Sequence, residues 1–439
     1  MAFFKSSVGT LATQLLIILF GFANNALISH VLGASAQGTF AFITLIPVML
    51  ASLGNLGIGI SNVYFAGSKK LDLQTLFSNS LFMALGWGSV LVAGFIGIRT
   101  LFAISFKIEW DIIKIAAFAV PFSLSTLYLS NLVLGLNQIR RFNVIMLAPR
   151  AILFFGLVLF LYSLHYEIGY SAWAYLIAEA TTGVGVIFYV LFRIIKQRID
   201  FRIKPGAFIQ MLKFGLKGSP GNVLAFLNYR LGMFLILYFL DETALAFYSI
   251  SILLAEKIWL IPNAIGTVLF PKISSGTTSR QFTPTVCRIS LLLTICAALA
   301  LALICQPLIL FVFPAEYIAS VVPLLWLLPG VVMLGIPKIL TADLAGRGKP
   351  IYATISMSIT VVLNIGLNII LIPKMNISGA ALASTLSYAA SAILISLFFI
   401  RETGTKFSEL FIPHKSDFRL YRQFFNSLVL KKNSREKTL

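Results

Sequence analysis

Apolar segments of about 20 residues follow one another along most of the chain and are separated by short polar connections. A helix needs about 20 residues to cross a hydrocarbon core of roughly 30 Å. Hydrophobic residues make up 59% of the chain and charged residues 11%, a balance that would leave a water-soluble protein with large exposed apolar patches. The chain is therefore predicted to be an all-α polytopic membrane protein.

Windows of about 20 residues divide the apolar sequence into twelve predicted transmembrane helices. Short connections join them, and no extramembrane domain is predicted between them. The predicted spans are residues 8–31, 38–65, 75–98, 112–136, 143–164, 170–192, 211–239, 243–270, 284–313, 317–343, 351–372 and 379–400.

Lysine and arginine are unevenly shared between alternate connections. One set carries pairs such as Lys69 with Lys70 and Arg140 with Arg141, and the other set carries few basic residues. Because basic connections stay in the cytoplasm, both termini are predicted to be cytoplasmic. The net charge of +19 does not predict nucleic-acid binding, since the basic residues lie in short loops and a tail and not on one face.

An internal repeat is visible in the spacing of proline and glycine. Pro121 and Pro329 are 208 residues apart, and Gly156 and Gly366 are 210 apart. This agreement indicates a duplication of six spans, and two six-helix lobes with a central cleft are predicted. The predicted divisions are an N-terminal lobe at 1–192, a cytoplasmic linker at 193–210, a C-terminal lobe at 211–400 and a basic cytoplasmic tail at 401–439.

Charged residues inside predicted spans are the main functional candidates, because a charge at the bilayer centre costs at least roughly 2.5–3.5 kcal/mol. Arg230 lies in the seventh span, and Glu256 and Lys257 lie in the eighth. Two interpretations of Arg230 stay open. It either pairs with Glu256 and fastens the two helices, or it faces the cleft and holds a phosphate bidentately. Lys257 points about 100° away from Glu256, so one of the two is expected to face the cleft.

Three further charges are candidates. Lys213 and Lys217 lie one helical turn apart at the cytoplasmic end of the seventh span. They either extend to the lipid headgroups or recruit an anionic headgroup into an inward-open cleft. Glu179 lies about nine residues inside the sixth span, where it is either a titratable group or a structural partner.

Polar stripes are a weaker signal. Asn25 shares a face of the first span with Gln14 and Gly21, and Asn24 lies beside it. Such stripes either form hydrogen bonds between helices or line a hydrophilic cleft that binds sugar hydroxyls.

The sequence contains no phosphate-binding loop, no nucleophile elbow and no metal-ligand spacing. A membrane polymerase or ligase needs a sizeable outer loop, and the longest predicted one, at 99–111, offers only Glu109 and Asp111 as acids. A non-enzymatic transporter without a cofactor is therefore predicted. An ion gradient, of H⁺ or Na⁺, or downstream consumption of the substrate remains as its driving force.

Four sequence stretches carry a resemblance to a known family. The loop VLGASAQGTFAF is similar to the pattern after the first span of bacterial polysaccharide flippases, and KFGLKGSPGNVLAFLNYR is similar to their seventh span. LAGRGKP and ISGAALASTLSYA match after the tenth span and at the start of the twelfth. Two departures stand out: Gly232 where relatives often have an acid, and His30 where many have a basic residue. An ion-coupling role of the missing acid does not carry over.

The resemblance implies a MATE-like fold within the multidrug/oligosaccharidyl-lipid/polysaccharide (MOP) exporter superfamily. Its O-antigen (Wzx-type) members move undecaprenyl-pyrophosphate-linked oligosaccharides across the bacterial inner membrane, from the cytoplasmic to the periplasmic face. The implied partners are this lipid-linked oligosaccharide and membrane lipids, with a polysaccharide polymerase and a chain-length regulator as candidates. A drug exporter on the same fold and, in a different class, a membrane glycan polymerase or ligase are the alternatives.

Overall fold

The computed structural model describes residues 2–101, 107–163, 167–195, 203–216, 219–274 and 282–412. Every regular element in these ranges is a helix, so the all-α prediction is confirmed. The physical reason is that a helix closes its backbone hydrogen bonds within itself, which a chain needs where no water is present. Most of the predicted tail lies outside the described residues.

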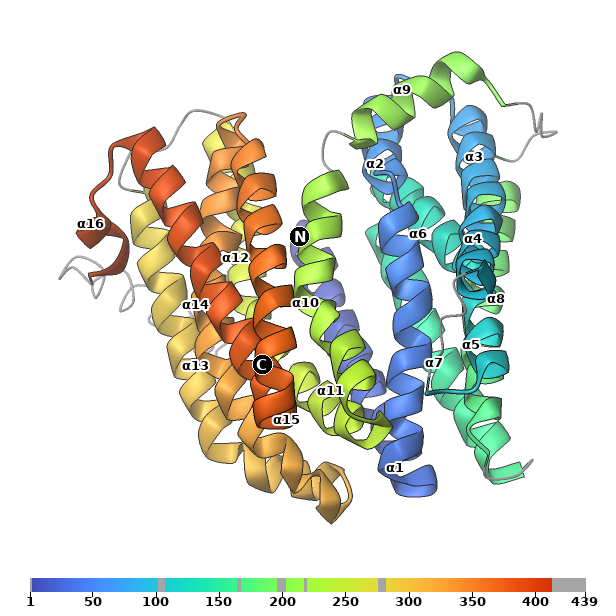
Figure 1. Ribbon diagram of the computed structural model, residues 1–439. Helices are drawn as coiled ribbons and strands as arrows, with labels where there is room; N and C mark the ends of the chain where they lie inside the picture. The colour runs from blue at the N-terminus through green and yellow to red at the C-terminus, as the bar shows by residue number, and fades with distance from the viewer. Residues whose placement is uncertain are drawn as a thin grey trace, which may run out of the picture. The chain divides into compact units, whose positions relative to one another are not determined.

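Ten helical stretches of the described chain are long and apolar enough to cross a membrane. Short π-helical or 3₁₀ turns join some of the helices end to end. The helices labelled in Figure 1 are α1 (Ala2–Gly54), α2 (Ile58–Ser68), α3 (Leu73–Phe82), α4 (Gly88–Leu101), α5 (Trp110–Ala117), α6 (Val120–Gly135), α7 (Ile139–Ser163), α8 (Gly169–Tyr189), α9 (Pro205–Leu216), α10 (Ser219–Phe239), α11 (Glu242–Ala255), α12 (Leu260–Ser274), α13 (Phe282–Val312), α14 (Val321–Gly346), α15 (Ile351–Thr403) and α16 (Phe407–Phe411).

Two helices, α1 and α15, are 53 residues long, far more than one bilayer crossing needs. Each is two helices that meet at a kink, at Gly33 with φ 80° in α1 and at Asn376 with φ 52° in α15. Glycine adopts a positive φ without steric cost, and asparagine tolerates it better than most residues. The kinks fall in the predicted connections after the first and the eleventh spans. The count of twelve spans and the cytoplasmic position of both termini stay predictions.

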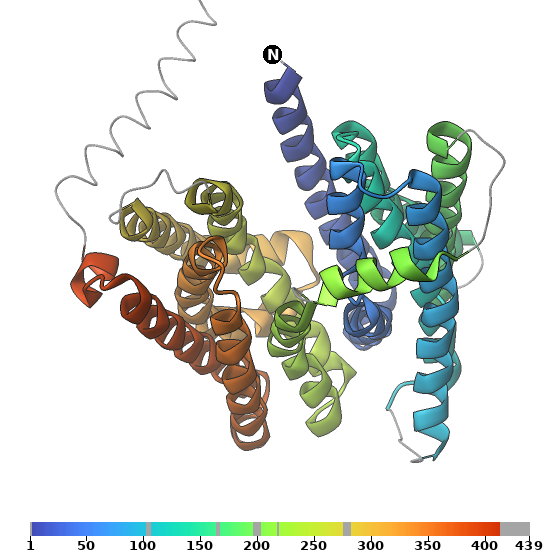
Figure 2. The ribbon, with the colours of Figure 1, turned by 90° about the horizontal axis from the view of Figure 1, so that it is seen from above.

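The predicted span 211–239 differs from the structure. Its first residues belong to α9, which lies across the ends of α2 and α3, and the next apolar stretch begins at Pro220 (Figures 1 and 2). Gly57 has φ 74°, and a Cβ added to it would lie 2.2 Å from the carbonyl oxygen of Gly215 in α9. Ser61 Oγ also donates to the Met211 carbonyl at 2.7 Å. These backbone contacts, which hydropathy does not report, hold α9 at the end of α2.

The chain forms two compact units. The boundaries fall inside helices, so α11, α13, α14 and α15 contribute residues to both units. The predicted lobes therefore stay a prediction. Unit 1 contains Met1–Ser251, Gln306–Pro323 and Ile365–Ala380, and unit 2 contains Ile252–Cys305, Leu324–Asn364 and Ala381–Leu439.

Glycines let the helices of unit 1 approach closely, as is common where helices pack in a membrane. An added Cβ at Gly183 of α8 would lie 2.9 Å from the Phe122 carbonyl oxygen of α6. At Gly38, in the second half of α1, it would lie 1.7 Å from the Glu242 carbonyl oxygen of α11. The backbone at Gly38 has no room for any side chain.

We expect Gly38→Ala to reduce the amount of folded protein in the membrane and to lower its apparent melting temperature in detergent. Overpacking costs about 1–3 kcal/mol, and here the added methyl group meets rigid backbone. Gly21→Ala in the same helix is the control, because nothing lies within 4 Å of its added Cβ. Equal melting temperatures of the two variants would contradict this packing.

The core of unit 2 lies where α14 meets the second half of α15. It includes Ile339, Leu340 and Leu344 of α14 with Ile395 and Phe399 of α15, all nearly inaccessible to solvent. Dispersion contacts and backbone approach hold such helices together in lipid, since burial of apolar groups offers little there.

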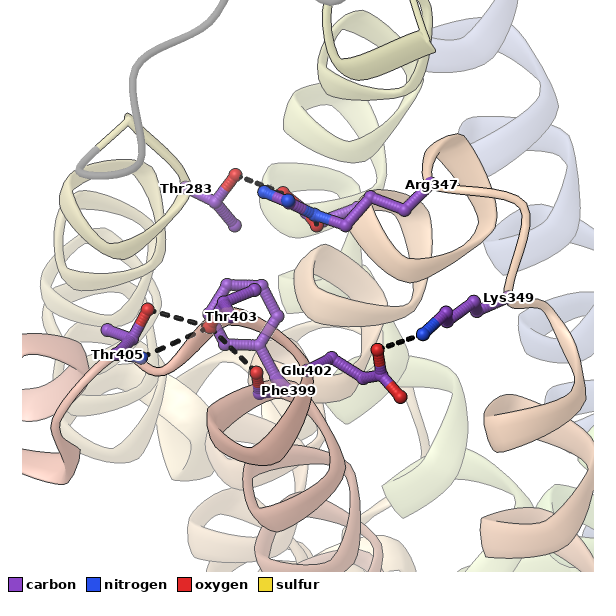
Figure 3. A network of polar contacts seen from close by, with 8 residues as sticks. Thr283, Arg347, Lys349, Phe399, Glu402, Thr403 and Thr405 are labelled. Carbon is purple, nitrogen blue, oxygen red and sulfur yellow. Dashed lines mark hydrogen bonds and ion pairs between the residues drawn. The ribbon is translucent and has the colours of Figure 1, made fainter.

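A polar network closes one end of this core (Figure 3). Arg347 at the end of α14 pairs with Asp343, whose other carboxylate oxygen accepts a hydrogen bond from Thr283 at the start of α13. Lys349 pairs with Glu402 at the end of α15, and this hydrogen bond raises the pKa of Lys349 above its usual value. The network thus ties together the ends of three helices.

We expect Arg347→Ala to destabilise the protein more than Asp343→Asn. Asp343 is fully buried, whereas the Arg347 side chain is 36% exposed. Removing the arginine leaves an uncompensated buried carboxylate, which costs about 3–5 kcal/mol. In Asp343→Asn the arginine reaches water and the amide oxygen still accepts from Thr283. Thermal unfolding of the two variants in the same detergent measures the difference, and the reverse order would refute the explanation.

Candidate functional site

Glu179 lies in a group of polar side chains contributed by four helices of unit 1. Its side chain, on α8, is only 9% exposed. Oε2 accepts a hydrogen bond from Ser123 Oγ of α6 at 2.8 Å, and Oε1 lies 4.0 Å from a guanidinium nitrogen of Arg150 on α7. Asn24 of α1 donates from Nδ2 to the Arg150 carbonyl oxygen at 3.4 Å. The structure thus brings two predicted candidates to one arginine, Glu179 to its guanidinium and Asn24 to its main-chain carbonyl.

Asn25 is part of a different hydrogen-bond network in unit 1. Its Oδ1 accepts from Gln37 Nε2 at 2.8 Å, and the same nitrogen lies 3.2 Å from Ser249 Oγ of α11. Gln37 follows the kink of α1, so this network links the two halves of α1 to each other and to α11. Of the two interpretations of the stripe, these contacts favour the interhelical one for Asn25.

Arg230 lies in the middle of α10, nine residues and therefore about 14 Å from its end at Phe239. The residue is partly buried and makes polar interactions within the structure. Its predicted partner Glu256 belongs to the other unit, so the Arg230–Glu256 ion pair stays a prediction. Two residues further along α10, a Cβ on Gly232 would lie 3.3 Å from the Tyr248 hydroxyl. A side chain at Gly232 would therefore lie against this hydroxyl.

Two candidate lysines, Lys213 and Lys217, precede α10. Lys213 is exposed on α9, the helix that lies across the end of unit 1, and not inside a membrane span. Such a position suits contact with an anionic headgroup. Lys217 lies outside the described residues.

In unit 2, Glu256 and Lys257 lie in a 3₁₀ turn, Glu256–Trp259, that interrupts the predicted eighth span between α11 and α12. Pro262 explains the interruption: its ring clashes with the carbonyl four residues earlier, that of Ile258, and it lacks the N–H that would bond there. A mid-helix 3₁₀ segment of this kind often marks a hinge.

Lys338 of α14 completes the charged group of unit 2. Its Nζ lies 4.7 Å from the centre of the Trp259 ring, and the lysine interacts electrostatically with Glu256. Trp259 is fixed in place, because Nε1 donates to the Val331 carbonyl at 3.1 Å and its ring packs edge-on against Tyr388. Lys338 lies eight residues, about 12 Å, before the end of α14. A cation at that depth is stabilised by the carboxylate and by the face of the indole.

Arg150 and Lys338 are the residues that sequence reasoning did not assign to a site. Both are charged positions within predicted spans, which was the available signal. Their partners could not be predicted from the sequence, because these are far away along the chain. Glu179 is 29 residues from Arg150, and Trp259 is 79 residues from Lys338. Among the described residues, no group of three His, Cys, Asp or Glu side chains is arranged to hold a metal ion.

Comparison with known proteins agrees with these observations. The sequence model of a family described as "Polysaccharide biosynthesis protein" matches residues 4–322. No curated protein matches the chain by sequence.

Solved structures with the same fold are membrane transporters. The lipid II flippase MurJ in an inward closed conformation has a TM-score of 0.69 at 17% identity, covering 93% of this chain and 89% of MurJ. An inward-facing multidrug resistance MATE family transporter of the MOP superfamily has a TM-score of 0.68 at 16% identity, covering 90% and 98%. A MOP superfamily transporter from Pyrococcus furiosus has a TM-score of 0.64 at 16% identity, covering 91% and 94%. The expected MATE-like fold is confirmed.

Proposed function

Since the chain belongs to the family of polysaccharide biosynthesis proteins and has the fold of MOP superfamily transporters, we propose that it is a flippase for a lipid-linked oligosaccharide. It is a multi-pass membrane transporter and not an enzyme. In the proposal its substrate is an undecaprenyl-pyrophosphate-linked repeat unit of O-antigen or a related surface polysaccharide. The direction is from the cytoplasmic to the periplasmic face of the inner membrane.

The observation that carries the proposal is that charged side chains lie at membrane depth in a transporter fold. Arg230, Lys338 and the Arg150–Glu179 pair all lie well inside apolar helices. A charged diphosphate carried through a bilayer needs cations and polar groups along its path, whereas the polyprenyl chain can stay in lipid. In the proposal Arg230 holds the diphosphate bidentately, and the polar residues of the helices contact the sugars.

The proposal also includes a driving force and partner proteins. Rocking of two lobes alternates access to the binding cleft, and an H⁺ or Na⁺ gradient or downstream consumption of the product drives the cycle. The polysaccharide polymerase and the chain-length regulator are the proteins that would use the product. In the proposal Lys213, which is exposed on α9, contacts an anionic headgroup.

A small-molecule exporter is the second candidate. The observation that favours it is the likeness to a multidrug resistance MATE family transporter, which is nearly as strong as the likeness to MurJ. Nothing in the described residues favours a glycan polymerase or ligase.

Deletion of the gene separates the two candidates. A flippase predicts loss of surface polysaccharide, which a plasmid copy of the gene restores, and unchanged drug susceptibility. An exporter predicts normal surface polysaccharide with increased susceptibility to the drugs it exports. The second pattern would refute the flippase proposal.

A further inference from the structure

Arg150 is an arginine at the middle of a membrane helix whose side chain is half exposed. It lies 11 residues from the start of α7 and 13 from its end, or about 17 and 20 Å. Its side chain is 47% exposed. A guanidinium at this depth needs water, a counter-ion or a ligand, because contact with lipid tails is costly.

The exposure of Arg150 is not exposure to lipid. Four large side chains mark the lipid-facing stripe of α7: Val144, Phe155, Leu159 and Tyr162, each 58–64% exposed. At 100° per residue they point 120–180° away from Arg150 on the helix. Arg150 therefore faces away from the lipid stripe, toward the side of α7 on which Glu179 lies.

Glu179, the counter-ion of Arg150, lies too far away for a hydrogen bond. The closest pair of atoms, a guanidinium nitrogen and Glu179 Oε1, is 4.0 Å apart, beyond hydrogen-bond range. The carboxylate cannot easily come closer, because Ser123 Oγ holds its other oxygen at 2.8 Å. A guanidinium has five N–H donors in a planar fork that matches two oxygens of a carboxylate or phosphate. The Arg150–Glu179 pair does not form such a bidentate hydrogen bond.

Asn24 lies beside the backbone of Arg150. It is 3% exposed and donates to the Arg150 carbonyl oxygen at 3.4 Å, so α1 packs against α7 at this level. An anion within hydrogen-bond range of the guanidinium would occupy donors that Glu179, at 4.0 Å, does not.

We infer that Arg150 binds a phosphate group of an amphiphilic phosphate ester inside unit 1, with Glu179 as the counter-ion that this phosphate displaces. The inference rests on the proposed function in that it takes the ligand to be the diphosphate of the lipid-linked substrate. A membrane phospholipid headgroup has the same phosphate chemistry, so the test must separate the two sources.

The test measures binding of undecaprenyl diphosphate and of phosphatidylglycerol to the purified full-length protein in detergent. Arg150→Gln is expected to weaken undecaprenyl diphosphate binding about tenfold to a hundredfold, the loss of one or two charged hydrogen bonds. Glu179→Gln is expected to tighten it about threefold, because the competing charge is gone while Ser123 can still donate to the amide oxygen. Arg141→Gln, an exposed arginine at the end of the same helix, is the control and should not change binding.

The opposite signs of the two variants distinguish a binding site from a structural ion pair. If the pair is only structural, both variants lower the melting temperature and neither shifts the affinity for the diphosphate. That result, or a wild-type protein that binds neither lipid, overturns the inference. Equal shifts for phosphatidylglycerol would identify a headgroup site and overturn the assignment to the substrate.

Failure of this inference is separable from failure of the proposed function. A deletion strain that keeps its surface polysaccharide refutes the flippase proposal even where Arg150 governs diphosphate binding. Unchanged diphosphate binding in Arg150→Gln refutes the site even where deletion abolishes the polysaccharide.

Discussion

Cells in which Arg230→Ala replaces the wild-type protein are expected to lose their surface polysaccharide while the amount of transporter in the membrane stays normal. Arg230 lies about 14 Å inside α10, and in the proposed function its guanidinium holds the diphosphate with two parallel hydrogen bonds. Loss of two charged hydrogen bonds, at about 1.5–3 kcal/mol each, lowers the transport rate at least roughly a hundredfold.

Arg230→Lys provides the graded comparison. Lysine keeps the charge but has no planar fork, so it is expected to restore only part of the activity. Immunoblotting of membranes checks the amount of protein, and polysaccharide staining of the cell surface checks activity. Surface polysaccharide near the wild-type level in Arg230→Ala would remove this residue from the substrate path.

Glu256→Ala is expected to destabilise the protein through Lys338. The lysine interacts with Glu256 and lies over the Trp259 ring, about 12 Å inside α14. Without the carboxylate its charge stays at membrane depth, at a cost of about 2.5–3.5 kcal/mol. The apparent melting temperature in detergent and the yield of folded protein should both fall.

A second substitution tests whether Lys338 is the cause. Lys338→Met in the Glu256→Ala background removes the unpaired charge and keeps a long apolar side chain over Trp259, so most of the lost stability should return. Lys257→Met, which removes the neighbouring charge, is the matched control and should not rescue. Rescue by Lys257→Met and not by Lys338→Met would mean that Glu256 stabilises the adjacent lysine instead.

The membrane helices could be predicted from the sequence because the requirement for about 20 apolar residues leaves little choice. The connections after the first and the eleventh spans were also predictable, and the structure has its kinks there, at Gly33 and Asn376. Prediction from hydropathy fails where tertiary contacts determine the position of a helix. The contact between Gly57 and Gly215 keeps α9 out of the seventh span, and no windowed average of hydropathy reports a backbone contact across about 160 residues.

The candidate site was predictable in its parts and not in its arrangement. Burial depth singled out Glu179, because a carboxylate nine residues inside a span needs a partner. That its partners are Ser123 and Arg150 depends on how α6, α7 and α8 pack, which periodicity within one helix does not encode. The contact of Asn25 with Gln37, which lies beyond the kink of α1, was not predictable for the same reason.

The most direct test of the central claim is the membrane face that lipid-linked oligosaccharides occupy when the protein is absent. The gene is deleted, and intact spheroplasts and inverted membrane vesicles are treated with an enzyme that modifies the accessible sugars. The flippase proposal predicts accumulated repeat units that are modified only in inverted vesicles, because they remain on the cytoplasmic face. Repeat units modified in spheroplasts at the wild-type level would contradict it, since translocation would then proceed without this protein.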